Sequence, residues 1–288
     1  MSSISGKRRA KILRNVLFML GMGLILIAAI LYGPRLINIF ESNRAYEDLR
    51  NQVVQMPTTS PIATLKPIVD TVIATPGITE PPKSPEQIRA EELSAFYPCI
   101  EVDHEELIKQ NSDYIGWIYI PGTDISYPVC QGETNQEYLH KGFTGGYSAN
   151  GTIFLDRRNE SVLDSHTILY GHNMRSGAMF CYIKEYQDPD WAKEHPVFWF
   201  ITKDNQKLLF EVFSCDIVLP TDEVIYYTFI NINDITEKQS MIDYMLSNSV
   251  VDFGVSPASQ NSVMTLSTCM NNNTYRCAVG ASLVWMSN

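Results

Sequence analysis

Two apolar runs lie close together near the C-terminus of the chain. They read Val263-Met264-Thr265-Leu266-Ser267-Thr268-Cys269 and, after Met270-Asn271-Asn272-Asn273, Thr274-Tyr275-Arg276-Cys277-Ala278-Val279. Both runs are rich in β-forming residues, so they predict two strands, and the segment between them has turn chemistry. A thiol then ends one strand and a guanidinium begins the next. This arrangement can set a nucleophile beside a fixed positive charge.

Further apolar runs of the same kind occur upstream, separated by Gly, Pro and Asn. They cover residues 116–120, 125–129, 152–155, 167–170, 197–202 and 208–218. Together with the C-terminal pair they make about eight short strands, which is typical of a β-barrel or sandwich. Start signals and a charged stretch predict helices that decorate this domain. These helices cover about residues 85–96, 103–110, 188–195 and 234–246.

The N-terminal end has a different character. Five basic residues within positions 7–14 precede an uncharged apolar run over 15–34. As a helix this run is about 30 Å long, which matches the hydrocarbon thickness of a bilayer. We therefore expect a cytoplasmic tail at 1–14, a transmembrane anchor at 15–34, and the rest of the chain outside the cell. A cleaved signal peptide is the alternative, but no convincing small-residue cleavage site follows the run.

The segment after the apolar run predicts a spacer. Residues 41–54 are charged and polar with scattered apolar positions, as in a helix that continues out of the membrane. Seven prolines then fall between residues 56 and 85 among Ser, Thr and Ile, a composition typical of an extended linker. We expect residues 35–95 to be a stalk and Pro-rich linker that sets the β-domain, residues 96–288, away from the membrane.

Charge excludes one class of partner. The chain has 288 residues, of which 45% are hydrophobic, so it can bury a sizeable core. Its net charge is −10, and because residues 1–44 carry +6, the remainder carries −16. An acidic outer domain lacks the basic face that nucleic acid requires, so we expect no nucleic-acid partner.

Six cysteines in an outer domain raise the question of disulfides. No CxxC pair occurs and the spacings are irregular. If Cys269 has to stay reduced, an odd number remains, so we expect no complete framework and most cysteines as small buried hydrophobic residues. No cluster of His, Cys and Asp has ligand spacing, so we expect neither a metal nor a cofactor.

A cysteine attacks only as the thiolate and therefore needs a partner. Of the five histidines, His172 is the candidate, because it follows an apolar strand and a glycine and its side chain can project into a cleft. A loop histidine is the alternative. Taken singly, Cys269 is also consistent with a buried filler and Arg276 with a surface charge.

Several motifs together resemble the sortase family, in one consistent order over about residues 96–288. The form of the histidine motif and the helix-bearing insertion before the cysteine strand are similar to class B. No second apolar span follows Trp285, in contrast to the pilus-building class, which usually carries one. Cys277, directly after Arg276, departs from the family pattern and leaves an alternative redox state near the site open. The motifs are Gly116-Trp117-Ile118-Tyr119-Ile120-Pro121-Gly122-Thr123, Tyr127-Pro128-Val129, Gly151-Thr152-Ile153-Phe154-Leu155-Asp156, Tyr170-Gly171-His172-Asn173-Met174, and Thr265-Leu266-Ser267-Thr268-Cys269 with Arg276.

The resemblance implies a mainly β fold, a closed eight-stranded barrel with N-terminal and inserted helices after the transmembrane helix. It implies Cys269 as the nucleophile, His172 as the general acid and base, and Arg276 as the group that holds the substrate and the oxyanion. It also implies lesser substrate contacts at Ser267 and Asn135.

The implied activity is that of a membrane-anchored cysteine transpeptidase of the Gram-positive cell surface. Such an enzyme cleaves the C-terminal sorting signal of secreted proteins through a thioacyl intermediate. It then transfers the acyl group to an amine of a cell-wall precursor, or to a pilin lysine if the enzyme polymerises pilins. Two alternatives stay open: a hydrolytic cysteine protease with the same Cys and His, and a non-catalytic wall-binding β-domain.

Overall fold

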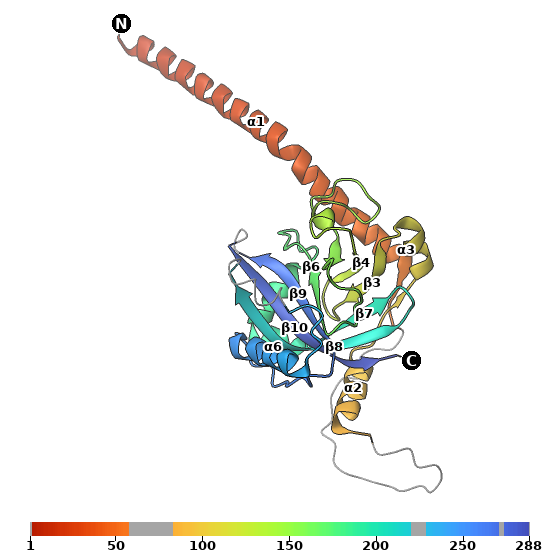
Figure 1. Ribbon diagram of the computed structural model, residues 1–288. Helices are drawn as coiled ribbons and strands as arrows, with labels where there is room; N and C mark the ends of the chain where they lie inside the picture. Colours follow the sequence, from red (N-terminus) through yellow and green to blue (C-terminus); the bar gives the residue numbers. More distant parts are fainter. Residues whose placement is uncertain (1, 58–82, 220–228, 271–273, 288) are drawn as a thin grey trace.

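The fold is built on a closed barrel of eight strands in the order β10-β8-β7-β3-β4-β5-β6-β9. The computed structural model describes residues 2–57, 83–219, 229–270 and 274–287 (Figure 1). The closed eight-stranded barrel expected for the chain is confirmed. Its strands are β3 (Tyr114–Tyr119), β4 (Ser126–Cys130), β5 (Ile153–Leu155), β6 (His166–Tyr170), β7 (Val197–Thr202), β8 (Lys207–Val218), β9 (Val263–Met270) and β10 (Tyr275–Met286).

Strand direction decides which chain segments meet. Six of the neighbouring pairs are antiparallel, whereas β4–β5 and β6–β9 are parallel. Because β6 and β9 run parallel, their C-terminal ends lie at the same end of the barrel. The antiparallel β9–β10 pair brings the start of β10 to that end too. Residues far apart in sequence therefore meet where β6 and β9 end.

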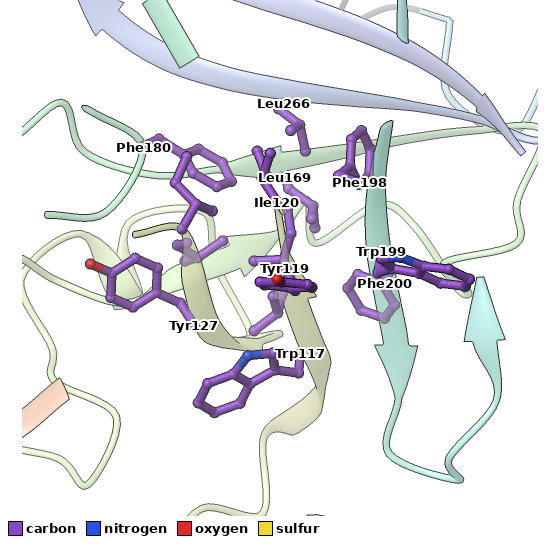
Figure 2. Packing of buried hydrophobic residues seen from close by; sticks show 14 of the residues in the cluster. Trp117, Tyr119, Ile120, Tyr127, Leu169, Phe180, Phe198, Trp199, Phe200 and Leu266 are labelled. Atoms are coloured by element: carbon purple, nitrogen blue, oxygen red, sulfur yellow. The ribbon is translucent and has the colours of Figure 1, made fainter. Parts of the chain in front are cut away.

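The barrel interior is filled by large apolar side chains. Ile118 of β3 and Phe198 and Phe200 of β7, which share one face of the sheet, are completely buried. Leu169 of β6 and Leu266 of β9 point into the same cluster (Figure 2). Each fully buried side chain of this kind contributes about 1.5–3 kcal/mol to stability. The strands read as near-continuous apolar runs because helices and loops cover much of their outer face.

Short helices begin at the capping residues that the sequence indicates. The side chains of Ser84, Asp103 and Asp234 accept hydrogen bonds from backbone N–H groups in the first turns of α2, α3 and α6. Helix α6 packs on the outer face of β8 and buries Ile242 and Met245 in a second apolar cluster. The segments are α2 (Pro85–Phe96), α3 (His104–Gln110), α4 (Pro189–Glu194), α6 (Ile235–Asn248), and the 3₁₀ turns η1 (Glu137–Leu139) and η2 (Cys181–Gln187).

Helix α1 (Ser2–Val53) is continuous over 52 residues. Its N-terminal part projects away from the barrel (Figure 1). By length and composition, the part from Leu13 onward contains a candidate membrane span, and none of its apolar window is buried. The C-terminal part packs on the barrel, where Tyr46, Leu49 and Val53 join the core. The expected helix after the apolar run is therefore present as part of one long helix.

Hydrogen bonds hold the end of α1 against the loop that precedes β5. The Tyr46 hydroxyl donates to the Gly151 carbonyl at 2.6 Å and lies 2.9 Å from Thr152 Oγ1. Asn38 Oδ1 accepts from the Ala149 N–H at 2.7 Å. Contact between α1 and the barrel therefore begins only four residues after Pro34, the end of the apolar run.

The expected stalk, residues 35–95, is described on both sides of its Pro-rich centre. The strand β1 (Val54–Gln55), just after α1, pairs with β2 (Glu101–Val102), and Leu93 of α2 is buried in the core. Residues 58–82 lie outside the described part of the chain. The packed unit thus includes residues before 58 and after 82, because apolar side chains on both flanks are buried against the barrel.

Candidate active site

A cleft of about 600 Å³ opens where β6 and β9 end and β10 begins. All five site residues expected from the sequence line this cleft. They are Asn135, His172, Ser267, Cys269 and Arg276. The barrel closure is what unites them, because three come from the β9–β10 hairpin, whereas His172 and Asn135 lie 97 and 134 residues before Cys269 in sequence.

The register of the β9–β10 pair places Cys269 and Arg276 directly opposite each other. Cβ atoms of directly opposed residues are about 4.5–5.5 Å apart. Side chains alternate along a strand, so Leu266 and Val279, which are a paired couple in the core, face the barrel interior. The thiol and the guanidinium therefore lie together on the other face, which lines the cleft.

His172 lies just past the end of β6, where the chain continues beside β9. The Thr268 hydroxyl donates to the Gly171 carbonyl at 2.8 Å, and the Asn173 side-chain amide donates to the Cys269 carbonyl at 2.9 Å. These two bonds extend the parallel pairing beyond the strand. They hold the backbone of His172 beside Thr268 and Cys269.

The surroundings of His172 set its tautomer and its charge. Its Nε2 lies 2.8 Å from the Leu139 carbonyl, and because a carbonyl only accepts, Nε2 must carry the hydrogen. Nδ1 is then the nitrogen that gains a proton when the ring becomes charged. Burial lowers the pKa of His172, the charges of His140 and Arg276 lower it further, and the Leu139 carbonyl acts in the opposite direction.

A buried carboxylate organises the wall of the cleft. Asp156, directly after β5, is fully buried and accepts from the Arg158 guanidinium at 2.9 and 2.8 Å. It also accepts from the Tyr170 hydroxyl and the Asn135 side-chain amide, each at 2.9 Å. Burial alone would raise the pKa of Asp156, but the Arg158 and Tyr170 donors hold it at about 2. A permanent negative charge thus orients three side chains that line the cleft.

The two lesser predictions, Asn135 and Ser267, differ in their surroundings. The Asn135 side chain is fixed at both ends, because its Oδ1 also accepts from the Arg157 N–H at 2.8 Å. Ser267 is almost completely buried at the cleft floor. A direct contact of either residue with substrate stays a prediction.

Cys277 faces the interior of the barrel although it follows Arg276. It is fully buried, its sulfur lies 3.8 Å from Cys215 Sγ, and its thiol donates to the Ile183 carbonyl at 3.4 Å. The contact with Cys215 and burial both raise the pKa of Cys277. All six cysteines are present as thiols. Within the described ranges no group of three His, Cys, Asp or Glu side chains could hold a metal ion.

Sequence reasoning missed the residues that support the site. Asp156 and Arg158 directly follow an apolar run, and this charged pair after a buried strand was a usable signal. Leu139 contributes only a backbone carbonyl, so no side-chain pattern reveals it. His140 lies beside His172 only because η1 folds over the end of β6, as the ring contact between them shows.

A thiol, an imidazole and a guanidinium in one cleft form the side-chain set of thiol-dependent acyl transfer, and comparison with known proteins gives the family. Residues 118–284 match the family model of the Sortase domain. Sortase B of Staphylococcus aureus is 35% identical over 199 residues, which cover 68% of this chain and 80% of that protein. Sortase B of Listeria monocytogenes is 33% identical over 172 residues, which cover 59% of this chain and 68% of that protein.

Solved structures give the same answer. The X-ray structure of Clostridium perfringens sortase B aligns with a TM-score of 0.60 and 29% identity over 64% of this chain and 100% of that chain. The substrate complex of Staphylococcus aureus sortase B aligns with a TM-score of 0.59 and 31% identity over 69% of this chain and 92% of that chain. The chain belongs to the sortase family of cysteine transpeptidases. Within that family its relatives are of class B.

Proposed function

We propose that this chain cleaves the C-terminal sorting signal of secreted proteins, with Cys269 as the nucleophile, His172 as the general acid and base, and Arg276 as the ligand of the oxyanion. The observation that carries this proposal is that these three side chains line one cleft and that Arg276 stands directly opposite Cys269. A volume of about 600 Å³ suits a short peptide segment. The substrate complex of the Staphylococcus aureus relative supports the same class of ligand.

The first half of the reaction forms a thioester. The Cys269 thiolate attacks the carbonyl carbon of the scissile peptide bond, and the carbonyl electron pair moves onto oxygen. The Arg276 guanidinium donates to that oxyanion, a contribution of about 10²–10³ in rate by analogy with single oxyanion donors. His172 gives its Nδ1 proton to the departing amine nitrogen as the C–N bond breaks.

The second half returns the thiol. An amine attacks the thioester carbon, His172 takes up its proton, and the C–S bond breaks to restore the thiolate. One sortase B relative was solved in complex with triglycine, which supports a primary amine as the acceptor here. A cell-wall precursor supplies such an amine, as does a pilin lysine, whereas water as the acceptor gives hydrolysis.

The apolar part of α1 supports a membrane location for this chemistry. An uncharged run over 15–34 is long enough to span, and the basic residues before it favour a cytoplasmic N-terminus. The barrel then lies outside the cell, where secreted substrates emerge. Protease added to intact cells should digest the barrel and spare an epitope tag at the N-terminus, and the reverse pattern would rule out this topology.

Mass spectrometry of a trapped thioester tests the nucleophile. The full chain is incubated with a library of sorting-signal peptides, and we expect an acyl adduct on Cys269. Cys269→Ala should lose both adduct and cleavage. Cys99→Ala is the matched control, because Cys99 is partly buried and lies outside the cleft. Equal cleavage by the Cys269→Ala chain would refute the assignment.

Product analysis separates the two catalytic alternatives. With triglycine as a probe amine, a transpeptidase gives the peptide–triglycine conjugate as the main product, whereas a protease gives the free acid at the same rate with or without the amine. A wall-binding domain without activity gives neither product.

A further inference from the structure

Three aromatic rings from two chain segments make two stacked contacts beside the cleft. The imidazole of His140 is stacked on that of His172, with ring centroids 5.5 Å apart and planes 20° apart. The ring of Tyr147 also stacks on that of His140, with ring centroids 6.0 Å apart and planes 30° apart. His140 and Tyr147 are both exposed. The half-buried imidazole of His172 thus stacks on the exposed imidazole of His140.

Two consecutive residues hold His172 from two directions. The Leu139 carbonyl accepts from the edge of the ring, at Nε2 and 2.8 Å, while the side chain of His140 covers a face of the ring. A hydrogen bond at one nitrogen still allows the ring to tilt about that contact. The stacked ring removes this freedom, so the orientation of Nδ1 depends on both residues.

The exposed loop that carries His140 is well braced. The Ser148 N–H donates to the His140 carbonyl at 2.9 Å, and Lys141 forms a β-bridge with Tyr147. Ser148 Oγ also lies 3.0 Å from Ser42 Oγ on α1. His140 therefore has a fixed backbone although its side chain is exposed.

Charge distinguishes His140 from a plain aromatic residue at this position. The titratable and charged groups around His172 are His140 from the loop after η1, Arg276 from β10 and the Cys269 thiol from β9. The charge of His140 and that of Arg276 both lower the pKa of His172. A phenylalanine would stack equally well but could not repel a proton on its neighbour.

We propose that His140 is a positioning residue for His172, whose stacked ring fixes the plane of that imidazole and whose charge, once protonated, opposes a second charge on it. This role rests on the proposed function, in which Nδ1 of His172 moves the proton. The stacking and the repulsion are properties of the folded chain and can be measured without turnover.

The test uses two variants at one position. His140→Phe keeps the stack and removes the charge, and His140→Ala removes both. His195→Phe is the matched control, because His195 stacks on Trp191, with ring centroids 4.0 Å apart, outside the cleft. The full chain in detergent micelles carries labelled imidazole carbons, and its five histidines give spectra in which His172 is assigned from a His172→Gln sample.

We expect the titration midpoint of His172 to rise by a few tenths of a pH unit in both His140 variants, because a neighbouring positive charge is lost. His140→Ala should also lower kcat about tenfold with little change in KM, through misplacement of the ring, and His140→Phe should retain more kcat. The control should change neither quantity. An unshifted midpoint in both variants overturns the charge role, and equal kcat in the two variants overturns the stacking role. If the native chain turns over no peptide, the proposed function fails while the titration still decides the charge role.

Discussion

The position of Arg276, directly opposite Cys269, indicates that the shape of its side chain matters as well as its positive charge. Arg276 stands opposite Cys269 across an antiparallel pair, and in the proposed reaction its planar guanidinium donates to the carbonyl oxygen of the substrate as that oxygen develops charge. A guanidinium presents several N–H donors in a rigid fork, whereas an ammonium is a compact charge on a flexible stem. Geometry as well as sign should therefore matter at this residue.

Replacement of Arg276 by lysine tests this point. We expect Arg276→Lys to lower kcat/KM by about 10²-fold, close to the loss in Arg276→Ala, because the ammonium does not reproduce the fork. Steady-state cleavage of a sorting-signal peptide measures the effect. Arg157→Lys, at an exposed arginine outside the cleft, should stay near the native value. Native activity in Arg276→Lys would show that charge alone suffices.

At the scale of elements, the parallel pair β6–β9 and the neighbouring strand β5 build the site together. The pair aligns Tyr170 with Ser267, and the bonds beyond it carry His172 to the level of Cys269. Asp156, at the end of β5, ties β6 and the loop before η1 to the same wall. The site is thus a property of three neighbouring strands, β5, β6 and β9.

Asp156→Asn tests whether the buried carboxylate holds the cleft wall in place. An asparagine has one acceptor oxygen fewer than the aspartate, and its amide N–H groups would face the N–H and O–H donors that now bind Asp156. The Arg158 side chain, which is 41% exposed, also loses its charge partner. We expect the free energy of unfolding to fall by about 2 kcal/mol and KM to rise more than kcat falls. Urea unfolding and peptide kinetics measure the two effects. Asp164→Asn, at a carboxylate that caps the next loop, should leave KM unchanged.

A buried histidine at the start of β6, His166, predicts that stability depends on pH. His166 is fully buried between the Phe229 carbonyl at 2.7 Å and Thr265 Oγ1 at 2.8 Å. Burial lowers its pKa to about 4, against about 6.5 in the unfolded chain. Between these values only the unfolded chain takes up the proton, so stability falls as the pH falls from 6.5 to 4.

This loss should total about 3 kcal/mol. Urea unfolding at a series of pH values measures it. In His166→Gln the slope of the unfolding free energy against pH should become shallower over this window by the contribution of one proton. This expectation holds even if the variant is less stable than the native chain at every pH. An unchanged slope would assign the acid sensitivity to other groups.

The whole molecule is organised around the union of α1 with the barrel. Tyr46, Leu49 and Val53 are buried in the barrel core, and contacts with the barrel begin at Asn38. If residues 15–34 span the membrane as proposed, the barrel sits close to the membrane surface and turns with the helix. The Tyr46 hydroxyl also bonds Gly151, whose neighbour Thr152 lines the cleft.

Two truncations separate the anchor from the docked helix. A chain that begins at residue 37 keeps every barrel contact of α1, so we expect its unfolding free energy to match that of the barrel in the full chain. A chain that begins at residue 57 loses the three buried apolar side chains of α1, and we expect a loss of about 3 kcal/mol after the entropy of helix ordering is offset. Urea unfolding of both soluble forms makes the comparison. Equal stability of the two would mean that α1 is merely adjacent to the barrel.

The limits of sequence reasoning are visible at particular residues. Strand positions and helix caps followed from local composition, because a capping hydroxyl or carboxylate acts within its own turn, as Ser84 and Asp234 do. The site triad followed from ordered motifs. The docking of Tyr46 did not, because a tyrosine on a polar helix looks the same whether it meets solvent or the barrel.

The sequence alone determined the apolar N-terminal run, the eight strands, the thiol–guanidinium hairpin and the family, because each is written in local periodicity or in contiguous motifs. Only the tertiary structure decided that Leu139 and His140 hold His172, that Asp156 anchors the cleft wall, that Cys277 faces inward and that α1 packs on the barrel. These features depend on barrel closure, which brings together residues that are about a hundred positions apart. No local pattern records which of the distant segments will be neighbours.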